Sequence, residues 1–240
     1  MLTAKAARLA RRELGRRLPR RGGVPWPWAI LGGLFWLGIA LWLGASLWRM
    51  PKGHLLSGPW GWCLLGGLGA GMVFFSLCPL RPLYVFGHEL THWLAAKATF
   101  HRTGAFRLGL SRGSVEIEGS SGLVALAPYV CPLYLLLLGG VLAFLSLLPL
   151  SFPPWLPLLG AVALGLCLAY HWVLTAMALL RGQKDLEVWG RALSATFILA
   201  GNLAVLLAAL ALASPRPALL WEIPWALLQQ AARLLLAHLG

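Results

Sequence analysis

Charged side chains are scarce in this sequence, and acidic ones are the scarcest. Only 11% of the 240 residues are charged, and Asp and Glu together number 7. Soluble domains carry about 25% charged residues, which keep a water-facing surface hydrated. The composition therefore excludes an ordinary soluble globular protein. With 59% hydrophobic residues, the chain belongs first to the membrane class.

Cysteine is also sparse, and its placement excludes a cysteine-based scaffold. None of the 4 cysteines forms a CxxC pair, and all of them lie within apolar stretches. This pattern argues against a zinc knuckle and against a disulfide framework. We interpret these residues as core packing residues: Cys63, Cys78, Cys131 and Cys167.

Positive charge is concentrated at the start of the chain, where eight of the 20 Lys and Arg precede residue 22. This segment lacks interleaved aromatics and leads directly into an apolar run, so we exclude a nucleic-acid partner. We predict that residues 1–22 form a basic cytoplasmic segment that contacts anionic lipid and orients the chain. We expect an integral protein of a bacterial inner membrane, with its first span retained and its N-terminus cytoplasmic.

The apolar segments predict an all-α polytopic membrane protein with about six transmembrane helices. A membrane-crossing helix needs about 20 mainly apolar residues. Residues 23–82 contain two such segments, and residues 83–213 contain a helix that carries the motif described below and three further spans. Residues 214–240 predict an amphipathic C-terminal helix that either spans or lies on the membrane. The predicted helices are Trp26–Trp48, Trp60–Leu80, Leu83–Thr99, 123–149, 155–181 and 190–213.

Two interruptions stand out among these helices. Pro128 and Pro132 predict a kink or break in the span at 123–149. Residues 101–121 are richer in charge and glycine, and residues 114–118 alternate polar and apolar side chains. This alternation predicts a short β-hairpin inserted after the helix at Leu83–Thr99. Irregular backbone survives at membrane depth only where protein buries it or water reaches it, so we expect the hairpin at an interface or along a cavity.

The sequence His88-Glu89-Leu90-Thr91-His92 predicts a zinc site. Residues four apart lie one turn apart on the same helix face, which lets two imidazoles bind one Zn²⁺ at about 2.0–2.1 Å. Glu89 is turned by about 100° from His88, close to the metal without ligating it. It is the candidate general base. Ionisable groups in an apolar span are costly and indicate function.

A zinc site needs a third protein ligand, and the residues leave two candidates open. Asp185 is the single aspartate of the chain and lies between two apolar spans, whereas His171 lies within one of them. The two are separated by about 21 Å along a continuous helix. Both could reach one metal only if the chain reverses at Gly182.

The HExxH motif in an apolar helix, the hairpin after it and the later aspartate together resemble the site-2 protease family of intramembrane zinc metallopeptidases. The resemblance covers roughly residues 83–210. It implies that His88, His92 and Asp185 hold zinc, that Glu89 is the catalytic base, and that the substrates are membrane proteins with a transmembrane helix. Members often carry glycine after the aspartate and proline before it, whereas Leu186 follows Asp185 here and no proline directly precedes it.

Two further hypotheses concern the surroundings of the motif. An intramembrane protease must unwind a helical substrate, and an exposed strand can hold the unwound segment through main-chain hydrogen bonds. Residues 105–118 are the candidate binding strand. Asn202, in the span at 190–213, is interpreted as a bridge between helices.

Three alternatives to an intramembrane endopeptidase remain. A membrane protease of the prenyl-protein type would take a glutamate as third ligand, and Glu187 or Glu222 would then replace Asp185. A metal transporter would need polar residues on several spans. The predicted spans of this chain carry almost none. A non-proteolytic scaffold would have no need for Glu89 between the two histidines. The sequence predicts no oligomeric state.

Overall fold

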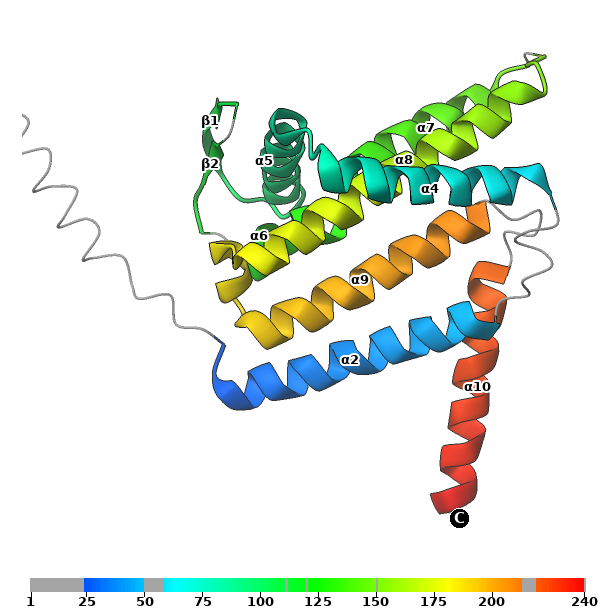
Figure 1. The fold of residues 1–240 in the computed structure, drawn as a ribbon. Coiled ribbons are helices and arrows are strands. Elements are labelled where there is room, and N and C mark those ends of the chain that lie inside the picture. Colours follow the sequence, from blue (N-terminus) through cyan, green and yellow to red (C-terminus); the bar gives the residue numbers. More distant parts are fainter. Residues whose placement is uncertain are drawn as a thin grey trace, which may run out of the picture.

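The computed structural model describes residues 24–49, 58–110, 112–119, 121–149, 151–212 and 219–239. The predicted basic segment at 1–22 lies outside this part of the chain. The described residues form a mostly helical bundle with one small antiparallel sheet (Figure 1). In chain order the elements are α2 (Trp26–Arg49), α4 (Pro59–Leu77), α5 (Arg81–Ala98), β1 (Thr103–Leu108), β2 (Gly113–Ile117), α6 (Gly122–Val130), α7 (Leu133–Leu147), α8 (Trp155–Arg181), η1 (Lys184–Glu187), α9 (Arg191–Leu212) and α10 (Leu219–Leu239).

Within the described ranges, four helices are long and apolar enough to cross a membrane: α2, α4, α8 and α9. The bent pair α6 and α7 makes a fifth if it forms one span. The predicted number of about six is therefore not confirmed. The difference lies in α5, which carries Arg81, Glu89 and Lys97 within 18 residues and is not among the candidate spans. The helix with the HExxH motif is a shorter, more polar element at one end of the bundle (Figure 1).

The spanning helices pack as two groups, α2 against α9 and α4 against α8, with α7 also beside α8 (Figure 1). Glycine residues, which have no side chain, let α4 and α8 approach closely. A Cβ at Gly67 would overlap the backbone of Val162, and one at Gly165 would overlap the backbone of Leu64. Small residues at helix crossings allow backbone-to-backbone contact in membranes, where no hydrophobic force drives helices together.

The turn between α4 and α5 positions the helix of the motif. Leu80 has a left-handed conformation, with φ 40°, and Pro82 follows within the first turn of α5. Two tyrosines fix this turn from other helices. The Tyr170 hydroxyl donates to the Leu80 carbonyl at 3.2 Å, and the Tyr134 hydroxyl donates to the Leu83 carbonyl at 2.7 Å. Proline at a helix start loses no intrahelical hydrogen bond, so Pro82 is tolerated in the first turn of α5.

Both predicted interruptions are confirmed. The helix expected at 123–149 breaks between Val130 and Leu133, and its two halves, α6 and α7, meet at 64°. The hairpin pairs β1 with β2 in antiparallel register, with Phe106 opposite Val115 and a bulge nearer its base. Figure 1 shows the hairpin beside α5 at one end of the bundle.

Helix α10 covers part of the predicted C-terminal helix, whose residues 214–218 lie outside the described chain. It meets α2 at the end of the bundle away from the hairpin (Figure 1). The Trp42 indole N–H donates to the Pro224 carbonyl at 3.2 Å, and Arg49 donates to Gln230 at 2.8 Å. Its contacts with α2 therefore hold it against the bundle.

We expect Gly67→Val to weaken the α4–α8 contact, because its side chain would collide with the backbone of Val162. Overpacking of this kind costs about 1–3 kcal/mol. Gly69→Val is the matched control on the same helix, because no atom lies within 4 Å of a Cβ there. Thermal unfolding of the purified variants measures the difference, and equal stability of the two would contradict this view of the interface.

Candidate metal centre

Helix α5 brings the two motif histidines together. The Nε2 atoms of His88 and His92 lie 3.2 Å apart. Only 9% of the His88 side chain and 12% of the His92 side chain is exposed. The spacing of one helical turn thus presents two imidazole nitrogens to the same point, as the sequence predicts.

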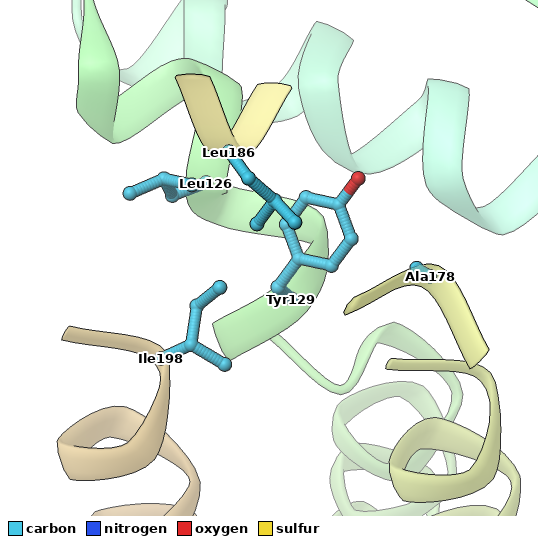
Figure 2. Close-up of a cluster of buried hydrophobic side chains, with 5 residues drawn as sticks. All are labelled: Leu126, Tyr129, Ala178, Leu186 and Ile198. Carbon is cyan, nitrogen blue, oxygen red and sulfur yellow. The ribbon is translucent and has the colours of Figure 1, made fainter. Parts of the chain in front are cut away.

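Asp185 reaches this point because the chain reverses after α8. Gly182 ends α8 with φ 64°, a left-handed conformation that glycine adopts without strain. The short helix η1 follows, and its residue Leu186 is buried in a cluster with Leu126, Tyr129, Ala178 and Ile198 (Figure 2). The apolar neighbour of Asp185 therefore anchors η1 in the core, which fixes the position of the carboxylate.

The three side chains form a group with metal-site geometry. The Asp185 Oδ2 atom lies 3.6 Å from His88 Nε2 and 3.8 Å from His92 Nε2. Tetrahedral zinc with ligands at about 2.0–2.2 Å separates its donor atoms by about 3.3–3.6 Å. The group matches this spacing closely, and two imidazoles with one carboxylate are donors that zinc accepts. Among the described residues, this is the one group of three potential metal ligands.

A backbone carbonyl orients His92. Its Nδ1 lies 2.8 Å from the Val124 carbonyl oxygen in α6. In an uninterrupted helix that carbonyl would accept from the N–H of residue 128. Residue 128 is proline, which has no N–H, so the carbonyl is free to accept from His92. Donation from Nδ1 leaves the Nε2 lone pair pointing at the metal position, the arrangement typical of a zinc-bound histidine.

Tyr129 holds the carboxylate. Figure 2 shows its ring in the buried cluster and its hydroxyl pointing out of it. The hydroxyl lies 3.1 Å from Asp185 Oδ2 and 2.7 Å from the atom assigned as Gln183 Oε1. A hydroxyl has one proton, so it satisfies both neighbours by donating to Asp185 and accepting from the Gln183 amide in its rotated orientation. The oxygen nearest the histidines thus has a donor of its own.

The charge state of Asp185 suits a cation. Burial raises the pKa of Asp185, but the adjacent imidazoles of His88 and His92 lower it by more, so the net pKa lies below the ordinary value. The carboxyl group is therefore an anion at neutral pH. One carboxylate anion with two neutral imidazoles compensates half of the charge of a divalent metal.

Glu89 is near this group without belonging to it. It lines a cleft of about 860 Å³ that α5, β2, α6 and η1 enclose, and the three ligand candidates line the same cleft. Strand β2 lies directly against Glu89, because a Cβ on Gly113 would come within 2.6 Å of the Glu89 Cγ. The hairpin can approach this closely only with glycine at position 113.

The other candidates from the sequence lie elsewhere. His171 is not part of the ligand group and faces a separate pocket on α8. Glu187 is exposed and pairs with Arg191 at 3.5 Å. Glu222 lies on α10, away from α5 (Figure 1). Asn202 bridges two helices, as interpreted from the sequence, by donating to the Tyr129 carbonyl at 2.8 Å.

Sequence reasoning missed the supporting roles of Tyr129 and Pro128. In the sequence, the segment that contains both residues indicated only a kink or break in the helix. One signal pointed to Tyr129, because it is the single hydroxyl-bearing residue in an otherwise apolar run between Gly122 and Leu133. A buried tyrosine hydroxyl normally has a hydrogen-bond partner. Nothing in the sequence indicated that this partner is Asp185.

Comparison of the chain with protein-family models, with curated proteins and with solved structures gave no match in any of the three.

Replacing Asp185 should abolish tight zinc binding. Asp185→Ala removes the oxygen donor, and two imidazoles alone make an incomplete site. Glu187→Ala is the matched control, because this acid lies two residues away on η1 outside the ligand group. Zinc content of the purified variants after dialysis against a weak chelator measures the effect. Retention of zinc by Asp185→Ala, or its loss from Glu187→Ala, would contradict the assignment.

Tyr129→Phe should weaken zinc binding by about tenfold while preserving the fold, because it deletes only the hydroxyl that donates to Asp185. Tyr170→Phe removes another tyrosine hydroxyl, which donates to the Leu80 carbonyl at the start of α5 rather than to Asp185, so its effect measures the contribution of the α4–α5 turn alone. Competition with a chromophoric chelator gives both affinities. An equal effect of the two substitutions would show that the Tyr129 hydroxyl has no specific role at the metal.

Proposed function

We propose that this protein is a zinc-dependent endopeptidase that hydrolyses peptide bonds in or near transmembrane segments of membrane proteins. One observation carries the proposal. His88, His92 and Asp185 meet at one wall of a cleft, and Glu89 lines the same cleft without joining them. Three ligands with a free acid beside them are the arrangement of a catalytic zinc, whereas structural zinc sites use four protein ligands.

Glu89 is the general base of the proposed reaction. Zinc, when bound, supplies Lewis acidity that polarises a peptide carbonyl and makes water a stronger acid. Glu89 takes a proton from the attacking water and delivers it to the nitrogen of the leaving amine. The scissile C–N bond breaks, and the products are a carboxylate and an amine. The close packing of Gly113 against Glu89 limits the freedom of the Glu89 side chain to move away from the ligands.

Strand β2 is suited to hold an unwound substrate. Residues of β2 line the cleft, and none from β1 does. Because β2 pairs with β1 along one edge only, its other edge has main-chain groups for a third strand. A substrate segment paired there would be extended, which exposes its carbonyls to attack. This supports the hypothesis that residues 105–118 bind substrate and narrows the binding strand to 113–117.

The apolar bundle supports a substrate that is itself in the membrane. Four described helices can cross a bilayer. Helix α5, which lines the cleft, lies at one end of the bundle (Figure 1). A peptide bond near the end of a transmembrane helix would lie at the depth of this cleft. A membrane protein with a transmembrane helix is therefore the proposed substrate class.

Charge supports an orientation with the cleft toward the cytoplasm. Four basic residues line the cleft: Arg81, Arg112, Arg181 and Lys184. Figure 1 shows the start of α2, which follows the arginine-rich residues 1–22, at the same end of the bundle as the start of α9. Lys and Arg concentrate on the cytoplasmic side of membrane proteins. The proposed localisation is a bacterial inner membrane, with both the N-terminus and the cleft on the cytoplasmic side.

The alternatives receive less support. A protease of the prenyl-protein type would need Glu187 or Glu222 at the metal, and both lie outside the ligand group. A transporter or a scaffold would need the histidines and Asp185 but would have no use for Glu89. Replacement of Glu89 therefore distinguishes a protease from these metal-binding proteins.

Glu89→Gln should retain zinc and lose at least about 100-fold in cleavage rate, because an amide cannot accept the proton of water. The probe is a set of single-span reporter proteins with helix-breaking residues near the cytoplasmic end of the span, reconstituted in the same liposomes as the enzyme. Mass spectrometry identifies the products. Glu222→Gln, on the remote α10, is the control and should cleave like the wild type.

Two results would reject the peptidase. One is cleavage by Glu89→Gln at the wild-type rate, and the other is a zinc-loaded wild type that cleaves none of the reporters.

A further inference from the structure

His88 lines a second pocket besides the cleft. This pocket has a volume of about 40 Å³ and is bounded by α5, α8 and the break between α6 and α7. Its lining includes the polar side chains of Tyr84, His88, Thr91, His171 and Thr175. Tyr84 and His88 are the residues that it shares with the cleft. The sequence gives no reason for a polar pocket between these apolar helices.

Two nitrogen atoms at this pocket have no partner within the described part of the chain. They are Nδ1 of His88 and Nε2 of His171, and both are buried. His92 differs, because its Nδ1 donates to the Val124 carbonyl at 2.8 Å. Buried polar groups in native proteins almost always have a protein or water partner. The two nitrogens therefore lack a hydrogen-bond partner among the described residues, as does the Tyr84 hydroxyl, which belongs to another residue lining the pocket.

Their chemistry is complementary through water. A neutral histidine that offers its Nε2 lone pair to a metal carries its proton on Nδ1, so His88 presents a donor to the pocket. His171 can present an acceptor at Nε2. The Thr91 hydroxyl gives its own proton to the Gly87 carbonyl at 2.7 Å, so toward the pocket it can only accept. One donor and two acceptors are the complement of a water molecule, which accepts one hydrogen bond here and donates two.

The pocket is large enough for this role. A water needs about 10–15 Å³ of such volume and two to four polar partners. The pocket thus has room for about two or three waters. Metal-bound histidines almost always donate their second N–H to a carboxylate, a carbonyl or a water. Val124 fills this role for His92, and a water in the pocket would fill it for His88.

We propose that this pocket is a water site in which water accepts a hydrogen bond from His88 Nδ1 and donates hydrogen bonds to His171 Nε2 and Thr91 Oγ1. His171 is then a positioning residue that fixes the tautomer and the ring orientation of His88 through water. The inference rests on the proposed metal centre but not on peptidase activity. It explains why a histidine lies on α8 although Asp185 completes the ligand group.

The test measures metal binding by the purified full-length protein. Zinc affinity is determined by chelator competition, and the visible absorption spectrum of the Co²⁺-substituted protein reports the ligand geometry. His171→Phe should weaken zinc binding by about 10- to 100-fold and change the Co²⁺ spectrum. His171→Gln, whose side-chain oxygen can accept from water, should restore most of the affinity. Leu174→Ala alters the packing of the same pocket without removing a polar group, and should bind zinc like the wild type.

A further variant keeps the test decisive if His171→Phe fails to fold. Thr91→Val is nearly isosteric, removes one acceptor of the water and should weaken zinc binding in the same direction. Wild-type affinity and an unchanged Co²⁺ spectrum in His171→Phe or Thr91→Val would overturn the inference. Equal losses in His171→Phe, His171→Gln and Leu174→Ala would also overturn it, because packing alone would then explain the effect.

The same measurements separate this inference from the proposed function. A wild type that binds no zinc rejects the metal centre and the water site together. A wild type that binds zinc and is insensitive to His171 rejects the water site alone. Zinc binding that depends on His171, in a protein that cleaves no reporter, rejects only the peptidase.

Discussion

The cost of burying polar groups inside an apolar helix bundle governs this structure. Two imidazoles and a carboxylate lie within hydrogen-bonding or metal-binding distance of one another. Such groups are expensive in a membrane unless they pair or bind a metal. Three elements meet around them: α5 supplies the histidines, η1 supplies Asp185, and α6 supplies a carbonyl and a hydroxyl. A metal shared by His88, His92 and Asp185, as we propose, would make their convergence favourable.

The irregular backbone near the site serves this convergence. Pro128 removes an N–H from α6 and thereby frees the Val124 carbonyl for His92. Gly182 reverses the chain after α8, and Leu186 anchors the turn that follows in the core. Gly113 lets the hairpin lie against Glu89. Pro128 and Gly182 depart from regular helix geometry next to groups of the proposed site. Departures from local regularity are expected at functional sites, where the rest of the fold compensates for them.

Much of this arrangement could be predicted from the sequence, and the remainder depends on contacts between distant segments. Apolar length predicted α8 to the residue, alternation predicted the hairpin, and two prolines predicted the break before α7. The predicted number of spans is not confirmed, because α5 resembles a membrane helix in length but carries Arg81, Glu89 and Lys97 and is not among the candidate spans of the described residues. His88 and His92 are four residues apart on one helix, so their proximity could be predicted from the sequence. The choice between Asp185 and His171 depends on the direction the chain takes after Gly182, and the partner of Tyr129 lies 56 residues away.

The central claim is that two imidazoles and one carboxylate hold zinc in this protein, and X-ray absorption at the zinc edge of the purified wild type tests it most directly. The account predicts a four-coordinate site with only nitrogen and oxygen in the first shell at about 2.0–2.1 Å, and outer-shell scattering from two imidazole rings. Sulfur scattering at about 2.3 Å, which would indicate cysteine ligands, or the signature of one imidazole or none, would contradict it.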